Sequence, residues 1–198
     1  MAVDFSAIAR WPDVPACYGW LTLDRRGDWR LQGERVTHGG LLAFINRQYG
    51  CDDGGCWFVR NGPQRVFVGL AYTPWVFRQE DGGFVSQTGA ASGAPKSLHV
   101  DEDGNVLLAT ALGIGLLDDR DLAGFIAQCH DPDGRPAGEN ALFALMKGKS
   151  GHVFRQGLPL EPIAAVDVPE RFNFRQHPQP TEGASREMPP VDRGRSGR

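Results

Sequence analysis

Cysteine is scarce in this sequence, and its spacing forms no metal-binding pattern. The chain of 198 residues has four cysteines, Cys17, Cys51, Cys56 and Cys129. It contains no Cys-x-x-Cys pair and no pair of closely spaced histidines, and a structural zinc site draws on two such pairs. We therefore expect free thiols, no metal site and no cofactor.

Long apolar runs and an excess of one charge are lacking as well. The N-terminal residues have neither the basic nor the apolar stretch of a signal peptide. The longest nearly apolar run, Val106–Leu117, is too short to cross a bilayer of roughly 30 Å as a helix. The net charge is −3 without a basic cluster, which argues against nucleic acid as a partner. We expect a cytoplasmic protein that contacts no membrane.

No catalytic motif is complete. Residues 148–150 read Gly-Lys-Ser, but Phe143 stands where a phosphate-binding loop needs glycine. Residues 101–105 resemble the start of a calcium loop, but Val106 replaces the glycine that should follow. No Gly-x-Ser-x-Gly sequence occurs, and Ser97 lies beside a linker-like stretch, where a nucleophile is hard to hold in place. We assign no catalytic residue.

What the sequence does contain is an internal repeat, Gly19–Tyr49 and Ser97–Cys129. Each copy predicts a strand, a tight turn ending in glycine, a second strand, and an amphipathic helix. The matched positions are Leu21, Leu23, Asp24, Gly27 and Trp29 with Leu98, Val100, Asp101, Gly104 and Val106, and then Leu41, Phe44 and Ile45 with Leu122, Phe125 and Ile126.

Between the copies, the sequence predicts four strands over residues 56–87. In the run Val66–Leu70, the side chains that would point to either face of a strand are apolar, which indicates a central strand covered on both faces. The short turns between the strands predict an antiparallel meander packed on the Leu41–Tyr49 helix. Residues 88–95 are small and polar and are typical of a linker.

These patterns predict an α+β fold with two similar lobes, each a meander or hairpin packed on one amphipathic helix. We expect an N-terminal lobe over residues 1–88 and a C-terminal lobe over 96–164. Residues 165–198 are rich in proline and are expected to form an extended or disordered tail, because few apolar groups remain to offset the entropy of ordering.

Aromatic and arginine side chains gather around the predicted meander. Arginine together with large aromatic residues is typical of recognition surfaces, although buried tryptophans are equally typical of a core. The predicted binding residues are Trp57, Arg60, Tyr72, Trp75 and Arg78.

The sequence resembles an uncharacterised proteobacterial domain-of-unknown-function family. The resemblance rests on Gly27-Asp28-Trp29-x-Leu31-x-Gly33, Leu41-Leu42-x-Phe44-Ile45, Trp57-Phe58-Val59 and Val66-x-Val68. It implies a duplicated α+β fold with a second half like pleckstrin-homology domains, and a bacterial ligand-binding role in signalling. No catalytic residue is implied.

We thus expect a non-enzymatic, regulatory binding module that holds a small molecule or a protein at the seam between the lobes or on the meander. The alternative is a small hydrolase-like enzyme with an acid/histidine site around Asp118, Asp119 or His130. A third alternative is a structural protein in which the Leu158–Phe174 segment joins two subunits.

Overall fold

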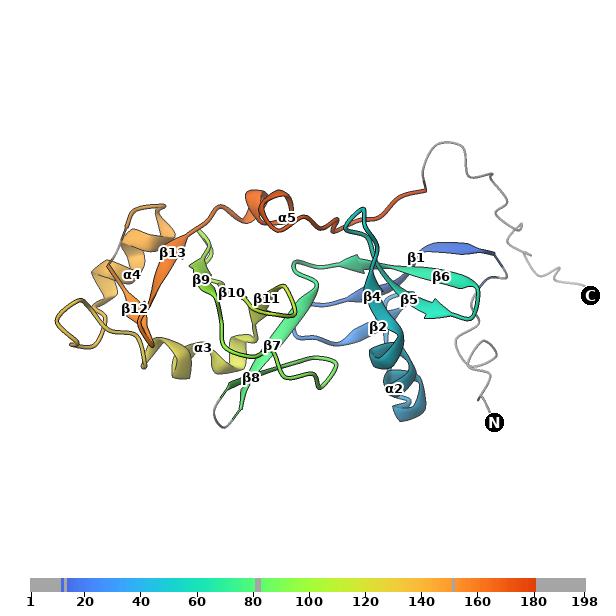
Figure 1. Cartoon of the computed structure of the whole chain (residues 1–198), viewed down its shortest axis with the longest axis horizontal. Helices are drawn as coiled ribbons and strands as arrows, with labels where there is room; N and C mark the ends of the chain where they lie inside the picture. The colour runs from blue at the N-terminus through green and yellow to red at the C-terminus, as the bar shows by residue number, and fades with distance from the viewer. Residues whose placement is uncertain (1–11, 13, 81–82, 151, 181–198) are drawn as a thin grey trace, which may run out of the picture.

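The computed structural model describes residues 12, 14–80, 83–150 and 152–180. The protein is α+β, as predicted, and its strands form two sheets (Figure 1). In the described part of the chain, no helix has the length and apolar character needed to cross a membrane.

The first sheet has six strands in the order β3-β2-β1-β6-β5-β4. Its elements are β1 (Ala16–Leu23), β2 (Trp29–Leu31), β3 (Glu34–Arg35), helix α2 (Gly39–Gln48), β4 (Tyr49–Cys51), β5 (Trp57–Asn61) and β6 (Gln64–Leu70). The predicted central position of β6 is confirmed, because β6 lies between β1 and β5. Helix α2 begins after His38, whose Nδ1 accepts from the Leu41 amide at 3.2 Å.

The second sheet has seven strands in the order β12-β13-β9-β10-β11-β7-β8. Its elements are β7 (Trp75–Glu80), β8 (Gly83–Ser86), β9 (Ser97–Val100), β10 (Val106–Ala109), β11 (Ile114–Leu117), helix α3 (Asp119–Ile126), helix α4 (Glu139–Met146), β12 (Phe154–Arg155) and β13 (Leu158–Pro162). Asp118 caps α3, because its side chain accepts from the Arg120 amide.

The predicted four-stranded meander is wrong. Strands β5 and β6 pair in the first sheet, whereas β7 and β8 pair in the second. The chain changes sheets over residues 71–74, where β7 joins β11 in parallel. A short connection with turn residues does not show whether the next strand pairs with the previous one or joins another sheet, because packing sets the strand partner. The predicted division of the chain into two lobes and a tail stays a prediction.

The two sheets share a strand order beyond the predicted hairpins. In the first sheet, β3-β2-β1 continues into the pair β6-β5, and β6 runs parallel to β1. In the second, β11-β10-β9 continues into the pair β13-β12, and β13 runs parallel to β9. Both hairpins are antiparallel, and a helix follows β3 and β11 alike.

The second sheet is covered on both faces. Leu107 and Leu116 pack in one core with Leu21 and Val68 of the first sheet. Alternate residues point to opposite faces of a strand, so Leu108 belongs instead to the core under α3 and α4. This explains why β10 is apolar throughout.

One turn geometry recurs four times in the described chain. In each turn an aspartate accepts two backbone N–H groups through one side-chain oxygen, and a glycine three residues later has φ between +78° and +83°. The turns are Asp24–Asp28, Asp52–Cys56, Asp101–Asn105 and Asp131–Arg135. The residues that resemble a calcium loop thus form a turn, in which the aspartate replaces missing backbone partners.

An arm after β13 connects both sheets. It includes a 3-10 turn (Ala165–Asp167) and helix α5 (Val168–Arg171), which lies along one long edge of the molecule (Figure 1). Val168 is fully buried. Beyond α5, the Arg175 amide donates to the Gly55 carbonyl and the Leu70 amide donates to the Gln176 carbonyl. Residues 165–180 therefore form part of the body, and the rest of the expected tail lies outside the described residues.

Candidate functional site

The predicted seam between the lobes is filled by aromatic rings. Tyr49 and Trp57 of the first sheet lie 5.4 Å and 5.2 Å from Trp75 of the second, between ring centroids. The Tyr49 hydroxyl donates to the Pro74 carbonyl at 2.9 Å, and Trp75 Nε1 donates to the Leu112 carbonyl at 2.8 Å. The ring contacts and the Tyr49–Pro74 hydrogen bond join the sheets, and Trp57 and Trp75, two of the predicted binding residues, pack at this junction.

Tyr72 is held in the interior between the two sheets. Its hydroxyl donates to Asp101 Oδ2 at 2.8 Å, and the guanidinium of Arg25 lies 4.8 Å from its ring centroid. Burial, followed by the hydrogen bond to the Asp101 carboxylate, raises the pKa of Tyr72 far above its usual value. Tyr72 is therefore a neutral hydrogen-bond donor.

The two predicted arginines lie apart from the seam. Arg78 forms an ion pair with Asp121 of α3, with 2.6 Å between Nε and Oδ2. Arg60 is exposed on β5, opposite Arg65 of β6. The five predicted binding residues do not form one surface, and their role in binding stays a prediction.

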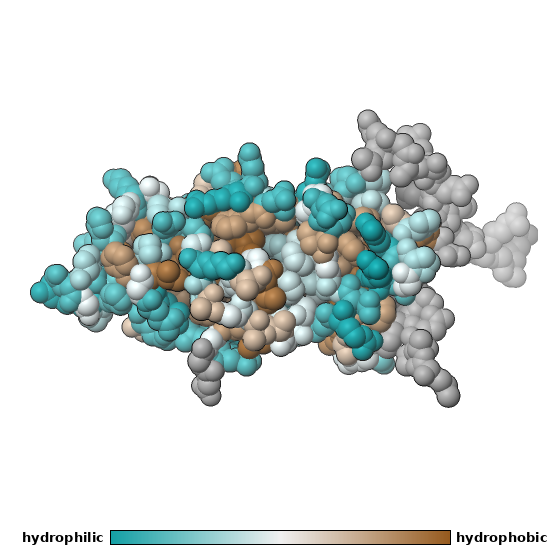
Figure 2. Space-filling view, viewed as in Figure 1, coloured by the Kyte–Doolittle hydropathy of each residue, from teal (hydrophilic) through white to brown (hydrophobic). Residues whose placement is uncertain are grey.

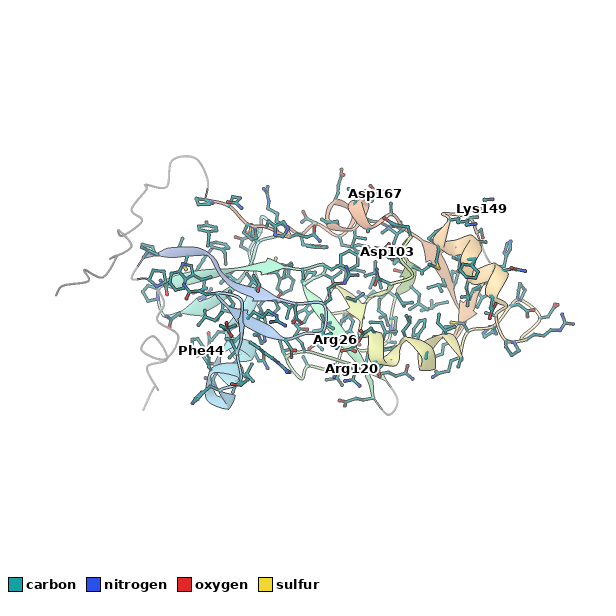
Figure 3. The ribbon with its side chains drawn as sticks, turned by 180° about the vertical axis from the view of Figure 1, so that it is seen from behind. Arg26, Phe44, Asp103, Arg120, Lys149 and Asp167 are labelled. Carbon is teal, nitrogen blue, oxygen red and sulfur yellow. The ribbon has the colours of Figure 1, made fainter. Side chains whose placement is uncertain are left out.

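The residues of the alternative acid/histidine site, Asp118, Asp119 and His130, also have separate contacts. Both oxygens of Asp118 accept from the side chain of Arg120, and Asp119 pairs with Arg26 at 2.7 Å. Burial raises the pKa of Asp118, but the hydrogen bonds from Arg120 outweigh it, so the net pKa is lowered. Figure 3 shows Arg26 beside Arg120 at the start of α3. His130 instead contacts the Asp131 carbonyl and stacks on Phe154.

The thiols do not offer a reactive site. Burial raises the pKa of Cys17 and Cys129 to about 11. Cys51 reaches about the same pKa through burial and the neighbouring Asp52 carboxylate. The thiolate is the reactive form of cysteine, so little of it is present near neutral pH. Among the described residues, no group of three His, Cys, Asp or Glu side chains is arranged to hold a metal ion.

A cavity of about 420 Å³ lies between α3, α4 and the second sheet. We call it the α3–α4 groove. It is lined by Val100, Asp103, Gly104, Leu122, Ile126, Glu139, Leu142, Phe143, Leu145, Met146 and Leu160. Hydrophobic side chains reach the surface over this end of the molecule (Figure 2), and Phe143 is 57% exposed.

The sequence makes the groove by leaving two apolar stripes only partly covered. Leu122 and Ile126 are one helical turn apart on α3, and Leu142 and Met146 are one turn apart on α4. Each pair packs on the core from the edge and is not fully buried. Side chains of both helices therefore line an apolar hollow.

The charge of the groove is one-sided. Its lining includes the carboxylates of Asp103 and Glu139 and no arginine, lysine or histidine. Asp103 belongs to the β9–β10 turn (Figure 3) and Glu139 to the first turn of α4. An apolar hollow with a few charged groups is typical of a ligand site, and sites of this kind span roughly 300–1,000 Å³.

Sequence reasoning missed this groove. The apolar stripes of α3 and α4 could be seen in the sequence as a helical period. The same period is expected for a stripe that is fully buried and for one that is only half covered, so it does not predict a groove. The proximity of Asp103 to α4 depends on the fold, because the two are more than thirty residues apart in the chain.

The chain is similar to one protein family and to solved structures of another. A family model, DUF2944, described as a protein of unknown function (DUF2946), matches residues 2–179. No curated protein matches. The chain is similar to the crystal structure of a DUF1285 family protein from Shewanella baltica OS155, with 16% identity, a TM-score of 0.42, and coverage of 54% of this chain and 90% of that one. It is also similar to a DUF1285 family protein from Silicibacter pomeroyi DSS-3, with 11% identity, a TM-score of 0.47, and coverage of 67% and 81%.

Proposed function

The chain belongs to this DUF2944 family of unknown function, and we propose that it is a regulatory binding module whose α3–α4 groove holds a small ligand with an apolar body and a cationic group. The observation that carries the proposal is the groove itself, with apolar walls from two helices and two carboxylates in its lining. Phe143 and Met146 supply walls that can adapt to a ligand, because methionine is flexible and polarizable.

The size and charge of the groove favour a small molecule over a protein. A protein interface of standard size buries roughly 800 Å² on each partner, whereas this cavity matches the volume of a small ligand. Because Asp103 and Glu139 line the groove and none of the lining residues is cationic, a positively charged group would complement the carboxylates, and an anionic one would be repelled.

Octylamine and octanoate test this proposal, because they share an apolar chain and differ in the charge of the head group. We expect octylamine, below its micelle-forming concentration, to raise the melting temperature of the full chain and octanoate to raise it less. A ligand present at one hundred times its Kd stabilises the folded state by about 2.7 kcal/mol. Calorimetric titration then gives the Kd.

Two exposed hydrophobic residues supply matched variants. Phe143 lines the groove, whereas Val166 is 81% exposed on the arm. Phe143→Ala should weaken octylamine binding at least several-fold, and Val166→Ala should leave it unchanged. Glu139→Gln should reduce the preference for octylamine over octanoate. Equal binding of both probes, or equal loss in both alanine variants, would contradict the proposal. Tight binding of a cationic amphipathic peptide in place of octylamine would indicate a protein partner.

We also infer that the two sheets arose from one duplicated unit and that the second half is like pleckstrin-homology domains. The shared strand order and the two matching Asp-to-Gly turns at residues 24–28 and 101–105 support duplication. The likeness to pleckstrin-homology domains is supported by the curl of the seven-stranded sheet. Its two edge strands, β12 and β8, approach each other, with Arg155 Cζ 5.2 Å from the ring centroid of Phe84. Failure of the two turns and their following helices to superpose would contradict duplication.

A further inference from the structure

Strands β9 and β13 bring a serine, a histidine and a glutamate together on one face of the second sheet. Ser97 and His99 are two residues apart on β9, and their side chains therefore share a face. His99 lies opposite Glu161 in the parallel pair β9–β13. His99 Nε2 is 2.9 Å from Ser97 Oγ, and His99 Nδ1 is 3.8 Å from Glu161 Oε2.

The ring of His99 is fixed by its surroundings. His99 is only 1% exposed, and Phe172 of the arm packs edge-on against it with ring centroids 5.6 Å apart. Within the described chain, Nδ1 has no hydrogen-bond partner. The Glu161 carboxylate faces this nitrogen and is itself 3.8 Å from Arg171. The imidazole is thus held between a hydroxyl and a carboxylate.

The carboxylate selects one tautomer of neutral His99. A proton on Nδ1 points toward negative charge, whereas a bare lone pair there would face it. The favoured tautomer therefore leaves the Nε2 lone pair directed at the Ser97 hydroxyl. This is the division of roles in a serine–histidine–acid triad, in which Nε2 receives the serine proton and the acid orients Nδ1–H.

We propose that Ser97, His99 and Glu161 form a hydrolytic site for acyl esters, with Ser97 as nucleophile, His99 as general base and Glu161 as positioning residue. Ser97 Oγ bonds to the acyl carbon while its proton passes to His99 Nε2. The bond from the acyl carbon to the alcohol oxygen then breaks, and the alcohol leaves with that proton. Water hydrolyses the acyl-serine through the same histidine, releasing the acid and restoring Ser97.

The 3.8 Å between His99 Nδ1 and Glu161 Oε2 exceeds the length of a hydrogen bond. Glu161 is half exposed, and a change of its side-chain rotamer would bring the carboxylate toward Nδ1. Ser97 lies just after the linker-like residues 88–95, as expected, and the second repeat copy begins with it. It is the first residue of β9 and is partly exposed, so the pairing of β9 with β10 and β13 holds the backbone of the nucleophile.

Burial keeps the base neutral. Burial first, and the positive charge of Arg171 second, lower the pKa of His99, while Glu161 opposes them. Glu161 from β13 and Arg171 from α5 are the charged groups that act on it, and the strand partner on β10 is the apolar Leu107. A neutral imidazole is the form that accepts a proton.

This site is independent of the α3–α4 groove. Leu98 and Val100 point to the opposite face of β9 and belong to the core under α3 and α4, and Val100 lines the groove. A variant that loses ligand binding in the groove can therefore still be tested for hydrolysis at Ser97, and the reverse also holds.

A fluorophosphonate probe tests the proposal on the full chain, because the Oγ of an activated serine displaces its fluoride and forms a stable bond to phosphorus. We expect time-dependent labelling, with the label mapped by mass spectrometry to the peptide that contains Ser97. Ser97→Ala should abolish it, and the buried strand serine variant Ser86→Ala should not. His99→Gln should slow labelling at least 100-fold, in the range by which a general base accelerates a reaction.

Glu161→Gln separates positioning from a merely structural role. It should slow labelling about tenfold, which is less than the loss expected for the general base itself. It should also shift the midpoint of the pH–rate profile to lower pH, because the lost carboxylate raised the pKa of His99. Ester hydrolysis with p-nitrophenyl acetate should follow the same order of variants. Label mapped elsewhere, no label on the wild-type chain between pH 5 and 9, or an unchanged rate in His99→Gln would overturn the proposal.

Discussion

The Tyr72 hydroxyl donates a hydrogen bond of 2.8 Å to the carboxylate of Asp101 and so ties the chain that leaves the first sheet to the β9–β10 turn of the second. The same carboxylate accepts the amides of Asp103 and Asn105. One buried aspartate thus shapes a turn and joins the two sheets.

Tyr72→Phe should lower the free energy of unfolding by about 2 kcal/mol, because it removes a hydrogen bond to a charged group. Tyr49→Phe is the matched control, since its hydroxyl donates to the neutral Pro74 carbonyl, and it should cost about 1 kcal/mol. Urea denaturation measures both. A larger loss in Tyr49→Phe would show that the Asp101 contact does not join the sheets.

Gly55→Ala should destabilise the protein far more than Gly134→Ala. The two glycines have φ of +78° and +79° in turns of the same kind, so the backbone cost, roughly 1–2 kcal/mol, is shared. An added Cβ at residue 55 would lie 2.6 Å from the carbonyl oxygen of Asn173, whereas one at residue 134 would meet nothing within 4 Å.

Hydrogen exchange gives this comparison a second measurement. In Gly55→Ala, the amides of Arg175 and Leu70, which pair the arm with the first sheet, should lose protection, and in Gly134→Ala they should keep it. Equal protection in both variants would mean that the arm does not depend on close approach to Gly55.

The Arg78–Asp121 pair should make the free energy of unfolding depend on pH. The hydrogen bond from Arg78 lowers the pKa of Asp121, so this carboxylate holds its proton less tightly in the folded state than in the unfolded one. Its contribution is present above the unfolded pKa of about 3.9 and is lost as pH falls through the lower folded pKa. The difference in unfolding free energy between wild type and Asp121→Asn should be constant above about pH 5 and shrink below pH 4. A difference that does not change with pH would exclude this linkage.

Arg155 is a buried cation whose contacts are rings and an amide. It is 3% exposed, lies 4.4 Å from the ring centroid of Phe125, and donates to Gln128 Oε1 at 2.9 Å. Its Nε has no partner in the described part of the chain, and burial lowers the pKa of its guanidinium.

Arg155→Lys should therefore destabilise the protein more than Arg155→Met. An ammonium group is more strongly hydrated than a guanidinium and cannot stack flat on Phe125, while methionine avoids the cost of a buried charge and keeps contact with the ring. Melting temperatures of the two variants decide the order. The reverse order would show that positive charge itself is needed between α3 and β8.

Elements with a strong local pattern could be predicted from the sequence. The apolar run in β6 and the apolar stripe on α3 could both be predicted, because each depends on neighbouring residues. The exchange of strands at residues 71–74 was not, because the parallel partner of β7 lies at Ile114–Leu117. The same limit applies to the triad, since Ser97 and His99 follow from a two-residue period but Glu161 requires the β13 register.

The arm has a consequence for how the molecule is made. Its residues leave β13, cover His99 with Phe172, and end against Gly55 and Leu70 of the first sheet. The contacts with Gly55 and Leu70 join residues that are more than one hundred positions apart in the chain. During synthesis, the apolar core shared by the two sheets stays uncovered until Val168 and Phe174 of the arm have emerged, so a chain that stops short of the arm exposes apolar surface that the folded protein hides.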